Sequence, residues 1–286
     1  MNNVALLLVV VSAFFHATWN LLAKRTNGGA TTVWQYDVAA TIIYAPIAIF
    51  LLFVLHVQIA LIGLAFICGS ACLHLGYFIL LQRGYRVGDL SFVYPLARGI
   101  GPFLATIIAI TVFGERPTII AFIGMLLVVG GVFLLVGGLS IIRRVRDHGA
   151  FFYAVIIGLF IATYTLWDKQ AVSVIRVQPI LYEYFNTVIR MLVLAPYGLR
   201  HTREIRLEWR AHHWDILGIA ILSPLAYILI LTALVFTPVS YVAPAREMSV
   251  LIGTFIGTRL LAEGNTRRRL LAASVILLGI IALAVG

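Results

Sequence analysis

The sequence is poor in charge. Asp, Glu, Lys and Arg make up 11% of its 286 residues, whereas 62% are hydrophobic and the mean hydropathy is +1.03. Soluble domains carry about 25% charged residues because their surfaces face water. The composition therefore excludes a soluble globular protein and predicts an all-α polytopic membrane protein, in which each helix satisfies its own backbone polar groups.

Cysteine is also scarce, and no catalytic or cofactor motif is present. Cys68 and Cys72 lie four residues apart in an apolar run, which is typical of packing residues rather than of a disulfide or a metal site. The sequence has no Gly-rich phosphate loop and no metal-ligand spacing. We therefore expect no cofactor, no metal and no enzymatic activity. The net charge of +10 resides mainly in short loops, so we expect no nucleic-acid partner.

Apolar runs of about 20 residues, the length that crosses a bilayer, recur along the chain. They predict ten transmembrane helices, at 4–24, 32–55, 58–81, 89–112, 117–141, 151–170, 178–199, 214–235, 239–260 and 268–285. The first run lacks the positive flank and the clear cleavage site of a signal peptide, so we expect it to remain as a helix. The remaining sequence is short turns and one basic linker.

The two halves of the chain repeat one another. Residues 15–24 (FHATWNLLAK) and 160–169 (FIATYTLWDK) share Phe, Ala, Thr, an aromatic residue, Leu and Lys in register, and Glu115 aligns with Glu263. We predict a first five-helix repeat at 1–139, a linker at 140–150 and a second repeat at 151–286. Because five is odd, the second repeat must be inverted, and such pairs hold binding sites near the membrane midplane of transporters.

The positions of the basic residues predict the orientation. Arg116, Lys169 and Arg176 lie in even-numbered loops, and Arg98, Arg190 and Arg246 lie within spans; the other fifteen of the 21 Lys and Arg residues lie in odd-numbered loops. Cytoplasmic loops carry the excess of positive charge. We therefore expect both termini outside.

Six ionisable residues lie within the predicted spans, where they need a cavity or a partner: Asp37, Arg98, Glu183, Arg190, Arg246 and Glu247. Arg98 and Arg246 are about ten residues into their spans, each shortly after a proline that interrupts helical hydrogen bonding. Broken helices of this kind build transporter sites, so both guanidinium groups are candidates to hold a substrate anion. The alternative is a structural ion pair, either Arg246 with Glu183 or Arg98 with Glu247. Glu247 is also a candidate proton carrier.

Polar stripes mark two further helices. Ser12, His16, Trp19 and Asn20 share one face of the first span, and Ser70, His74 and Tyr77 share one face of the third. Although a single such residue is often a packing residue, two stripes favour the lining of a cavity. The candidate substrate-binding residues are His16, Trp19, Asn20, His74, Tyr77, Tyr94, Arg98, Tyr164, Tyr227, Tyr241, Arg246 and Glu247.

Small residues crowd the fifth and tenth spans, among them Gly124, Gly131 and Gly279. Faces of this kind let helices approach closely in membranes. They either pack the two halves together or form a homodimer.

Several of these segments together resemble the EamA family of the drug/metabolite transporter superfamily. They are His16–Asn20 (HATWN) with Lys24, Pro95–Pro102 (PLARGIGP), Gly114–Glu115, Pro244–Glu247 (PARE) and Ala262–Glu263. The resemblance covers nearly the whole chain and implies ten helices in two inverted five-helix repeats. It also implies a multi-pass protein of the cytoplasmic (inner) membrane. Members are usually drawn with both termini in the cytoplasm, opposite to the orientation that the charges predict here.

We therefore predict a secondary active transporter that moves a small polar metabolite across the lipid bilayer by alternating access. An amino acid, or a small organic or phosphonate-type anion, fits a cavity that contains both signs of charge. The alternative is a lipid-linked metabolite flippase, in which the two arginines would bind an anionic headgroup.

Overall fold

The computed structural model describes residues 1–26, 29–87, 90–136, 148–252 and 266–286. All regular structure in these ranges is helical, as the composition predicts. The elements are α1 (Asn3–Ala23), α2 (Ala30–Ile49), the π-helical turn η1 (Phe50–Val54), α3 (Leu61–Val87), α4 (Leu90–Thr111), α5 (Ile119–Val136), α7 (His148–Ser173), α8 (Pro179–Arg200), α9 (Thr202–Phe236), α10 (Val239–Ala245) and α12 (Thr266–Val285).

Most of these helices have the apolar composition of membrane helices. Within the described ranges, five helices are both long and apolar enough to cross a bilayer: α1, α2 with η1, most of α3, most of α7, and α9. Shorter apolar stretches lie at Leu96–Thr111, Ile119–Leu135 and Leu271–Val285. The fold class predicted from the sequence is confirmed.

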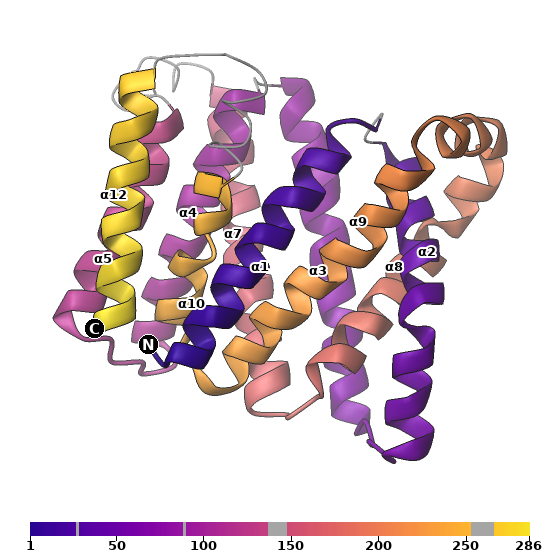
Figure 1. Ribbon diagram of the computed structural model, residues 1–286, viewed down its shortest axis with the longest axis horizontal. Coiled ribbons are helices and arrows are strands. Elements are labelled where there is room, and N and C mark those ends of the chain that lie inside the picture. Colours follow the sequence, from indigo (N-terminus) through magenta and orange to yellow (C-terminus); the bar gives the residue numbers. More distant parts are fainter. Residues whose placement is uncertain (27–28, 88–89, 137–147, 253–265) are drawn as a thin grey trace.

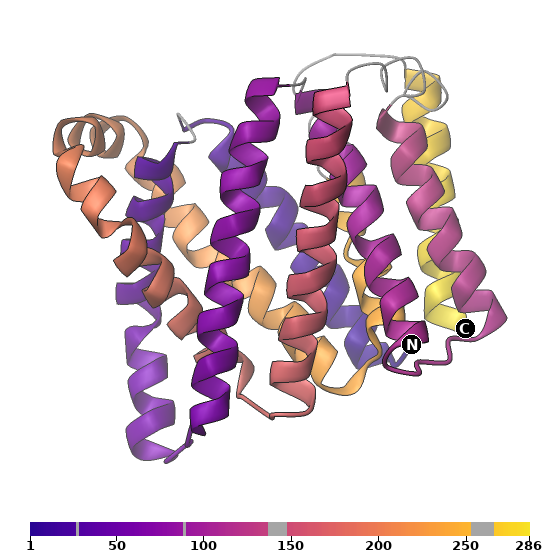
Figure 2. The ribbon, with the colours of Figure 1, turned by 180° about the vertical axis from the view of Figure 1, so that it is seen from behind.

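The two halves are inverted and interlocked. The helix α1 runs away from the end of the bundle that holds both termini, and α7, its counterpart in the second half, runs toward that end (Figures 1 and 2). Helices of one half pack on helices of the other, and equivalent helices make equivalent contacts. In this way α1 and α2 pack on α9, and their counterparts α7 and α8 pack on α3. Residues 137–147, which include most of the predicted linker, lie outside the described ranges, so the boundaries at 139 and 151 stay a prediction.

Small residues join α5 to α12. A Cβ atom added at Gly124 would lie 2.7 Å from the carbonyl oxygen of Gly279, and one added at Gly279 would lie 2.7 Å from that of Gly124. The two backbones therefore approach more closely than any side chain would allow. The small-residue faces pack the two halves together within one chain, and a homodimer stays an untested prediction.

The ninth predicted span is interrupted within the described residues. The helix α10 ends at Ala245, Arg246 and Glu247 form a turn, and helical structure resumes at Met248–Ile252. The carboxylate of Glu115 accepts hydrogen bonds from the backbone N–H groups of Val239 (2.8 Å) and Ser240 (2.9 Å), which caps the N-terminus of α10. The expected matching break after Pro95 is wrong, because α4 is continuous from Leu90 to Thr111.

The helix α9 bends where the basic loop meets the span. His212 has a non-helical φ of −133°, so residues 202–211 form a separate segment at the end of the bundle opposite the termini (Figure 1). Arg203, Arg206 and Arg210 are exposed on this segment. The C-terminal ends of α1, α3 and α8 all lie at this end (Figures 1 and 2).

Candidate substrate-binding cavity

One cavity lies between the two halves of the chain, and its empty volume of about 410 Å³ includes space open to solvent. We refer to it as the arginine cavity. Its walls come from α4, α7, α9 and the region of the α10 break: Arg98, Pro102, Ile161, Tyr164, Thr165, Tyr227, Ile230, Leu234, Val242, Ala243, Arg246 and Glu247. Five of the twelve candidate residues named from the sequence therefore meet in one place: Arg98, Tyr164, Tyr227, Arg246 and Glu247.

Arg98 is held by partners from the other half. Its Nε donates to Glu247 Oε2 at 3.0 Å, and its Nη2 donates to Ser249 Oγ at 3.1 Å. His16 Nε2 lies 3.5 Å from Nη1, and because a guanidinium only donates, this nitrogen is the acceptor of a neutral ring. Of the two ion pairs considered from the sequence, Arg98 with Glu247 is the one that forms.

Arg246 lies over an aromatic ring. Its guanidinium carbon lies 5.2 Å from the centroid of the Tyr227 ring, a cation–π geometry. Its Nε is buried without a hydrogen-bond partner, and among the described residues no ion pair joins it to a carboxylate. With Arg98 neutralised by Glu247, the arginine cavity keeps one net positive charge, at Arg246.

Asp168 supports the ring beneath Arg246, and the sequence analysis did not single it out. The hydroxyl groups of Tyr227 and Tyr182 both donate to its carboxylate, that of Tyr182 at 2.6 Å. Asp168 is 0% exposed. A carboxylate that accepts from the phenol makes the Tyr227 ring more electron-rich, which favours the cation above it.

The polar stripe on α3 packs behind these aromatic residues. The His74 ring lies 4.3 Å from the Tyr164 ring and 5.5 Å from the Tyr227 ring, measured between centroids. His74 Nδ1 lies 2.9 Å from the Ser70 carbonyl oxygen, and Asn186 Nδ2 donates to Ser70 Oγ at 2.8 Å. Tyr77 packs edge-on against Tyr164, at 5.9 Å. The stripe therefore packs against the aromatic residues that form the wall of the arginine cavity.

The structure does not place the remaining candidate substrate-binding residues in the wall of the arginine cavity. Trp19 packs edge-on against His16 at 5.0 Å, and Asn20 Nδ2 donates to the His16 carbonyl oxygen within α1. The Tyr241 hydroxyl accepts from Thr118 N–H at 3.2 Å and donates to the Gly286 carbonyl oxygen at 3.4 Å, so it links α10 to the ends of α5 and α12. The side chain of Tyr94 is outside the described part of the structure.

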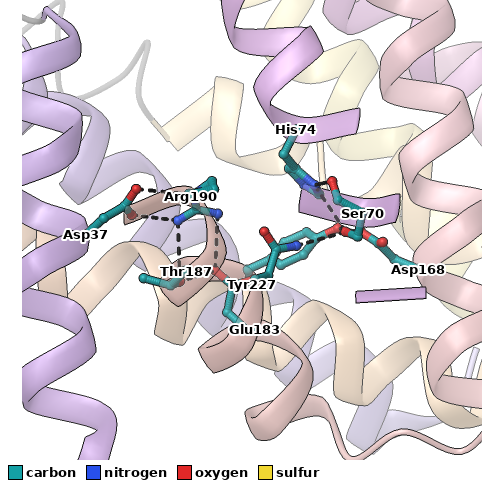
Figure 3. Close-up of polar contacts among 9 residues, drawn as sticks. Asp37, Ser70, His74, Asp168, Glu183, Thr187, Arg190 and Tyr227 are labelled. Carbon is teal, nitrogen blue, oxygen red and sulfur yellow. Dashed lines mark hydrogen bonds and ion pairs between the residues drawn. The ribbon is translucent and has the colours of Figure 1, made fainter. Parts of the chain in front are cut away.

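A second polar group, which we call the acid–arginine cluster, comprises Asp37, Glu183, Thr187 and Arg190 (Figure 3). Arg190 binds Asp37 in a bidentate manner, with Nη2 to Oδ1 at 2.7 Å and Nε to Oδ2 at 3.3 Å. Glu183 Oε1 lies 3.8 Å from Arg190 Nη1 and accepts from Thr187 Oγ1 at 3.4 Å. The cluster joins α2 to α8 and does not line the arginine cavity.

Comparison with known proteins agrees with this architecture. The model of the EamA-like transporter family matches the chain twice, at residues 3–137 and 148–285. No curated protein matches the sequence. A solved structure described only as "Crystal structure of protein" is similar over 100% of this chain and 98% of its own, with a TM-score of 0.77 and 12% sequence identity. At that identity, the similarity shows the fold alone.

Proposed function

Because the chain belongs to the EamA-like transporter family, in the drug/metabolite transporter superfamily, we propose that it is a secondary active transporter of a small polar metabolite bearing an anionic group. An amino acid, or a small organic or phosphonate-type anion, is the substrate class that fits best. The observation that carries this proposal is Arg246, a cation at the wall of a cavity with no carboxylate partner among the described residues. A substrate anion would supply the missing counter-charge.

The two arginines would then have separate roles. Arg246 holds the anionic group from its place above Tyr227, whereas Arg98 keeps Glu247 and Ser249 in position across the halves. A buried guanidinium binds a carboxylate or phosphate through charge-assisted hydrogen bonds, which are about twice as strong as neutral ones. The aromatic rings of Tyr164 and Tyr227 give the remaining wall shape and apolar contact.

Alternating access follows from the inverted halves. The arginine cavity has walls from both halves, and the helix is interrupted at Arg246 and Glu247, in the wall itself. Inverted-repeat transporters expose such a site to each side in turn by rocking one set of helices against the other. We propose that the break after α10 is the part of the wall that changes during this motion.

The orientation is part of the same proposal. We place the basic end of the bundle, with Arg203, Arg206 and Arg210, in the cytoplasm, and both termini outside the cytoplasmic membrane. Alkaline phosphatase fused after Gly286 is expected to be active, since the enzyme folds only outside the cytoplasm. An inactive fusion, with an active one placed after Arg200, would reverse the orientation.

A thermal-shift screen of the purified protein against a metabolite library tests the substrate class. A ligand that binds only the folded state raises the melting temperature by mass action. We expect stabilisation by compounds with a carboxylate, phosphonate or phosphate, and none by their uncharged esters or amides. Stabilisation only by neutral or cationic compounds would contradict the proposal, and stabilisation only by lipid-linked compounds would favour a flippase.

A further inference from the structure

The acid–arginine cluster has two acids for one base, and all three lie within the bundle (Figure 3). Asp37 is 0% exposed and Glu183 is 4% exposed. Asp37 takes both of the short contacts from Arg190, at 2.7 and 3.3 Å, whereas Glu183 has only a contact of 3.8 Å. One Arg190 cannot neutralise two carboxylates, so Glu183 carries the excess negative charge whenever it is ionised.

Glu183 also has an oxygen with no role in the cluster. In the described part of the chain, Oε2 is buried and has no hydrogen-bond partner. The side chain lines a pocket of about 200 Å³ of empty volume, whose other walls include Tyr44, Thr187, Pro224 and Ile228. Leaving a charged oxygen without a donor in such surroundings is costly, and adding one proton removes that cost.

We propose that Glu183 is a proton-binding site and that its protonation drives the transport cycle; the second part rests on the proposed transport function. In the step itself, a hydronium ion transfers a proton to Oε2 of the carboxylate: one O–H bond of the hydronium breaks, one forms on Oε2, and a water molecule is left. The neutral acid later returns the proton to water on the other side by the reverse transfer. Asp37 and Arg190 stay paired throughout and hold Glu183 in position.

The other buried carboxylates fit this role less well. Glu247 Oε2 accepts from Arg98 Nε at 3.0 Å, so its charge is already compensated. Both carboxylate oxygens of Asp168 already accept a hydrogen bond from a tyrosine hydroxyl group. Glu208, near one end of the bundle, has a donor on each oxygen, from Thr32 and Gln35.

Several ionisable groups surround Glu183, and α9 contributes only Pro224 and Ile228 to its pocket. The groups are Arg190 and Tyr182 on its own helix, Asp37, Tyr36 and Tyr44 on α2, and Asp168 on α7. Within the described ranges, Arg190 is the only cation in an ion pair with Glu183, and its shorter contacts go to Asp37. The positive charge of Arg190 would repel a sodium ion at this site.

Contacts made by the same helix, α8, join the neighbourhood of Glu183 to the arginine cavity. Asn186 lies one helical turn beyond Glu183 on α8 and donates to Ser70, whose carbonyl oxygen lies 2.9 Å from the His74 ring nitrogen. His74 packs on Tyr164 and Tyr227, both of which line the cavity. A displacement of α8 on proton binding would therefore reach the wall beside Arg246.

Infrared spectroscopy of the purified protein tests proton binding without any substrate. In a pH titration, we expect the C=O stretching band of a protonated carboxylic acid in the wild-type protein and loss of that band in Glu183→Gln. Glu208→Gln is the matched control, because it removes another buried carboxyl group, and it should keep the band. An unchanged band in Glu183→Gln would overturn the proposal.

A trapped pH dye in proteoliposomes tests the coupling, with the standard protein amino acids and small dicarboxylates as probes. We expect these probes to drive proton flux in the wild type and in Glu208→Gln. Glu183→Gln should lose this flux but keep probe exchange, because Gln mimics the protonated acid. Glu183→Asp keeps an acid and should keep the flux, with a shifted pH midpoint, which separates proton binding from misfolding.

The outcomes distinguish the two proposals. Probe exchange without proton flux in the wild type, or equal flux in Glu183→Gln, overturns proton coupling at Glu183 and leaves the transport function standing. Flux that depends on sodium rather than on pH also overturns it. If the wild-type protein moves none of the probes, the proposed substrate class fails, and the infrared titration alone decides whether Glu183 binds a proton.

Discussion

Arg98 on α4 and Glu247, just beyond α10, form a buried ion pair of 3.0 Å that connects the first half of the chain to the second. The charges compensate one another, which leaves Arg246 as the cation of the arginine cavity. The repeat makes the two arginines equivalent, yet Arg98 is paired with a carboxylate whereas Arg246 lies over the ring of Tyr227.

The Arg98–Glu247 pair is expected to contribute mainly to stability. Removing one partner, in Arg98→Met or Glu247→Gln, leaves the other charge buried and should lower the free energy of unfolding by about 3–5 kcal/mol. The double variant should be less destabilised than the sum of the two single variants. Denaturant unfolding of the purified proteins measures this coupling, and additive losses would show that the pair does not act as a unit.

Asp168→Asn is expected to weaken the support of Arg246. Asn has one acceptor oxygen where the carboxylate has two, so one of the hydroxyl groups of Tyr182 and Tyr227 loses its acceptor. The free energy of unfolding should fall by about 1–3 kcal/mol. The matched variant is Tyr182→Phe, which removes one donor from the same carboxylate. Ligand affinity should fall in Asp168→Asn more than in Tyr182→Phe, since only the former disturbs the ring beneath Arg246.

Glu115→Gln is expected to loosen α10. The carboxylate caps two backbone N–H groups, and Gln can accept only one of them with its oxygen. Loss of an N-terminal cap costs about 0.5–2 kcal/mol. The exposed neighbour Arg116 provides the control, and Arg116→Gln should leave the melting temperature unchanged. Equal melting temperatures for both variants would exclude a capping role for Glu115.

The contact between α5 and α12 can be tested with alanine. Gly124→Ala places a Cβ atom 2.7 Å from the Gly279 carbonyl oxygen and 2.9 Å from the Leu283 backbone nitrogen, so the helices must separate. Overpacking of this kind costs about 1–3 kcal/mol. Gly130→Ala on the same helix meets nothing within 4 Å and should be neutral or stabilising. If both variants melt at the same temperature, α5 and α12 are not packed through Gly124.

Much of this arrangement follows from the sequence because an ionisable side chain within a membrane span needs a cavity or a partner. The repeated segments predicted the inverted halves, and the ionisable residues within spans predicted that Arg98, Arg246 and Glu247 would meet. Between the two ion pairs considered, the sequence could not decide, since the choice depends on how the halves pack. Glu183 instead approaches Arg190 on its own helix, at i and i+7.

Other residues of the site depend on tertiary structure. The predicted sixth span ended at residue 170, which placed Asp168 at the membrane boundary, whereas α7 continues to Ser173 and buries it. Its counterpart in the first half is Ala23, so the repeat gave no signal either. Tyr241 matched the pattern of a cavity residue, yet its hydroxyl binds Thr118 and Gly286 because α10 is short and turns after Ala245.

The central claim is that Arg246 binds the anionic group of the substrate. Its most direct test is the dissociation constant of an anionic ligand from the thermal-shift screen, measured for the wild type, Arg246→Gln and the exposed control Arg200→Gln. Loss of a buried charge pair costs about 2–5 kcal/mol, so Arg246→Gln should weaken binding by about thirtyfold or more, while the neutral ester of the ligand binds both proteins equally weakly. Undiminished affinity of a correctly folded Arg246→Gln for the anionic ligand would contradict the account.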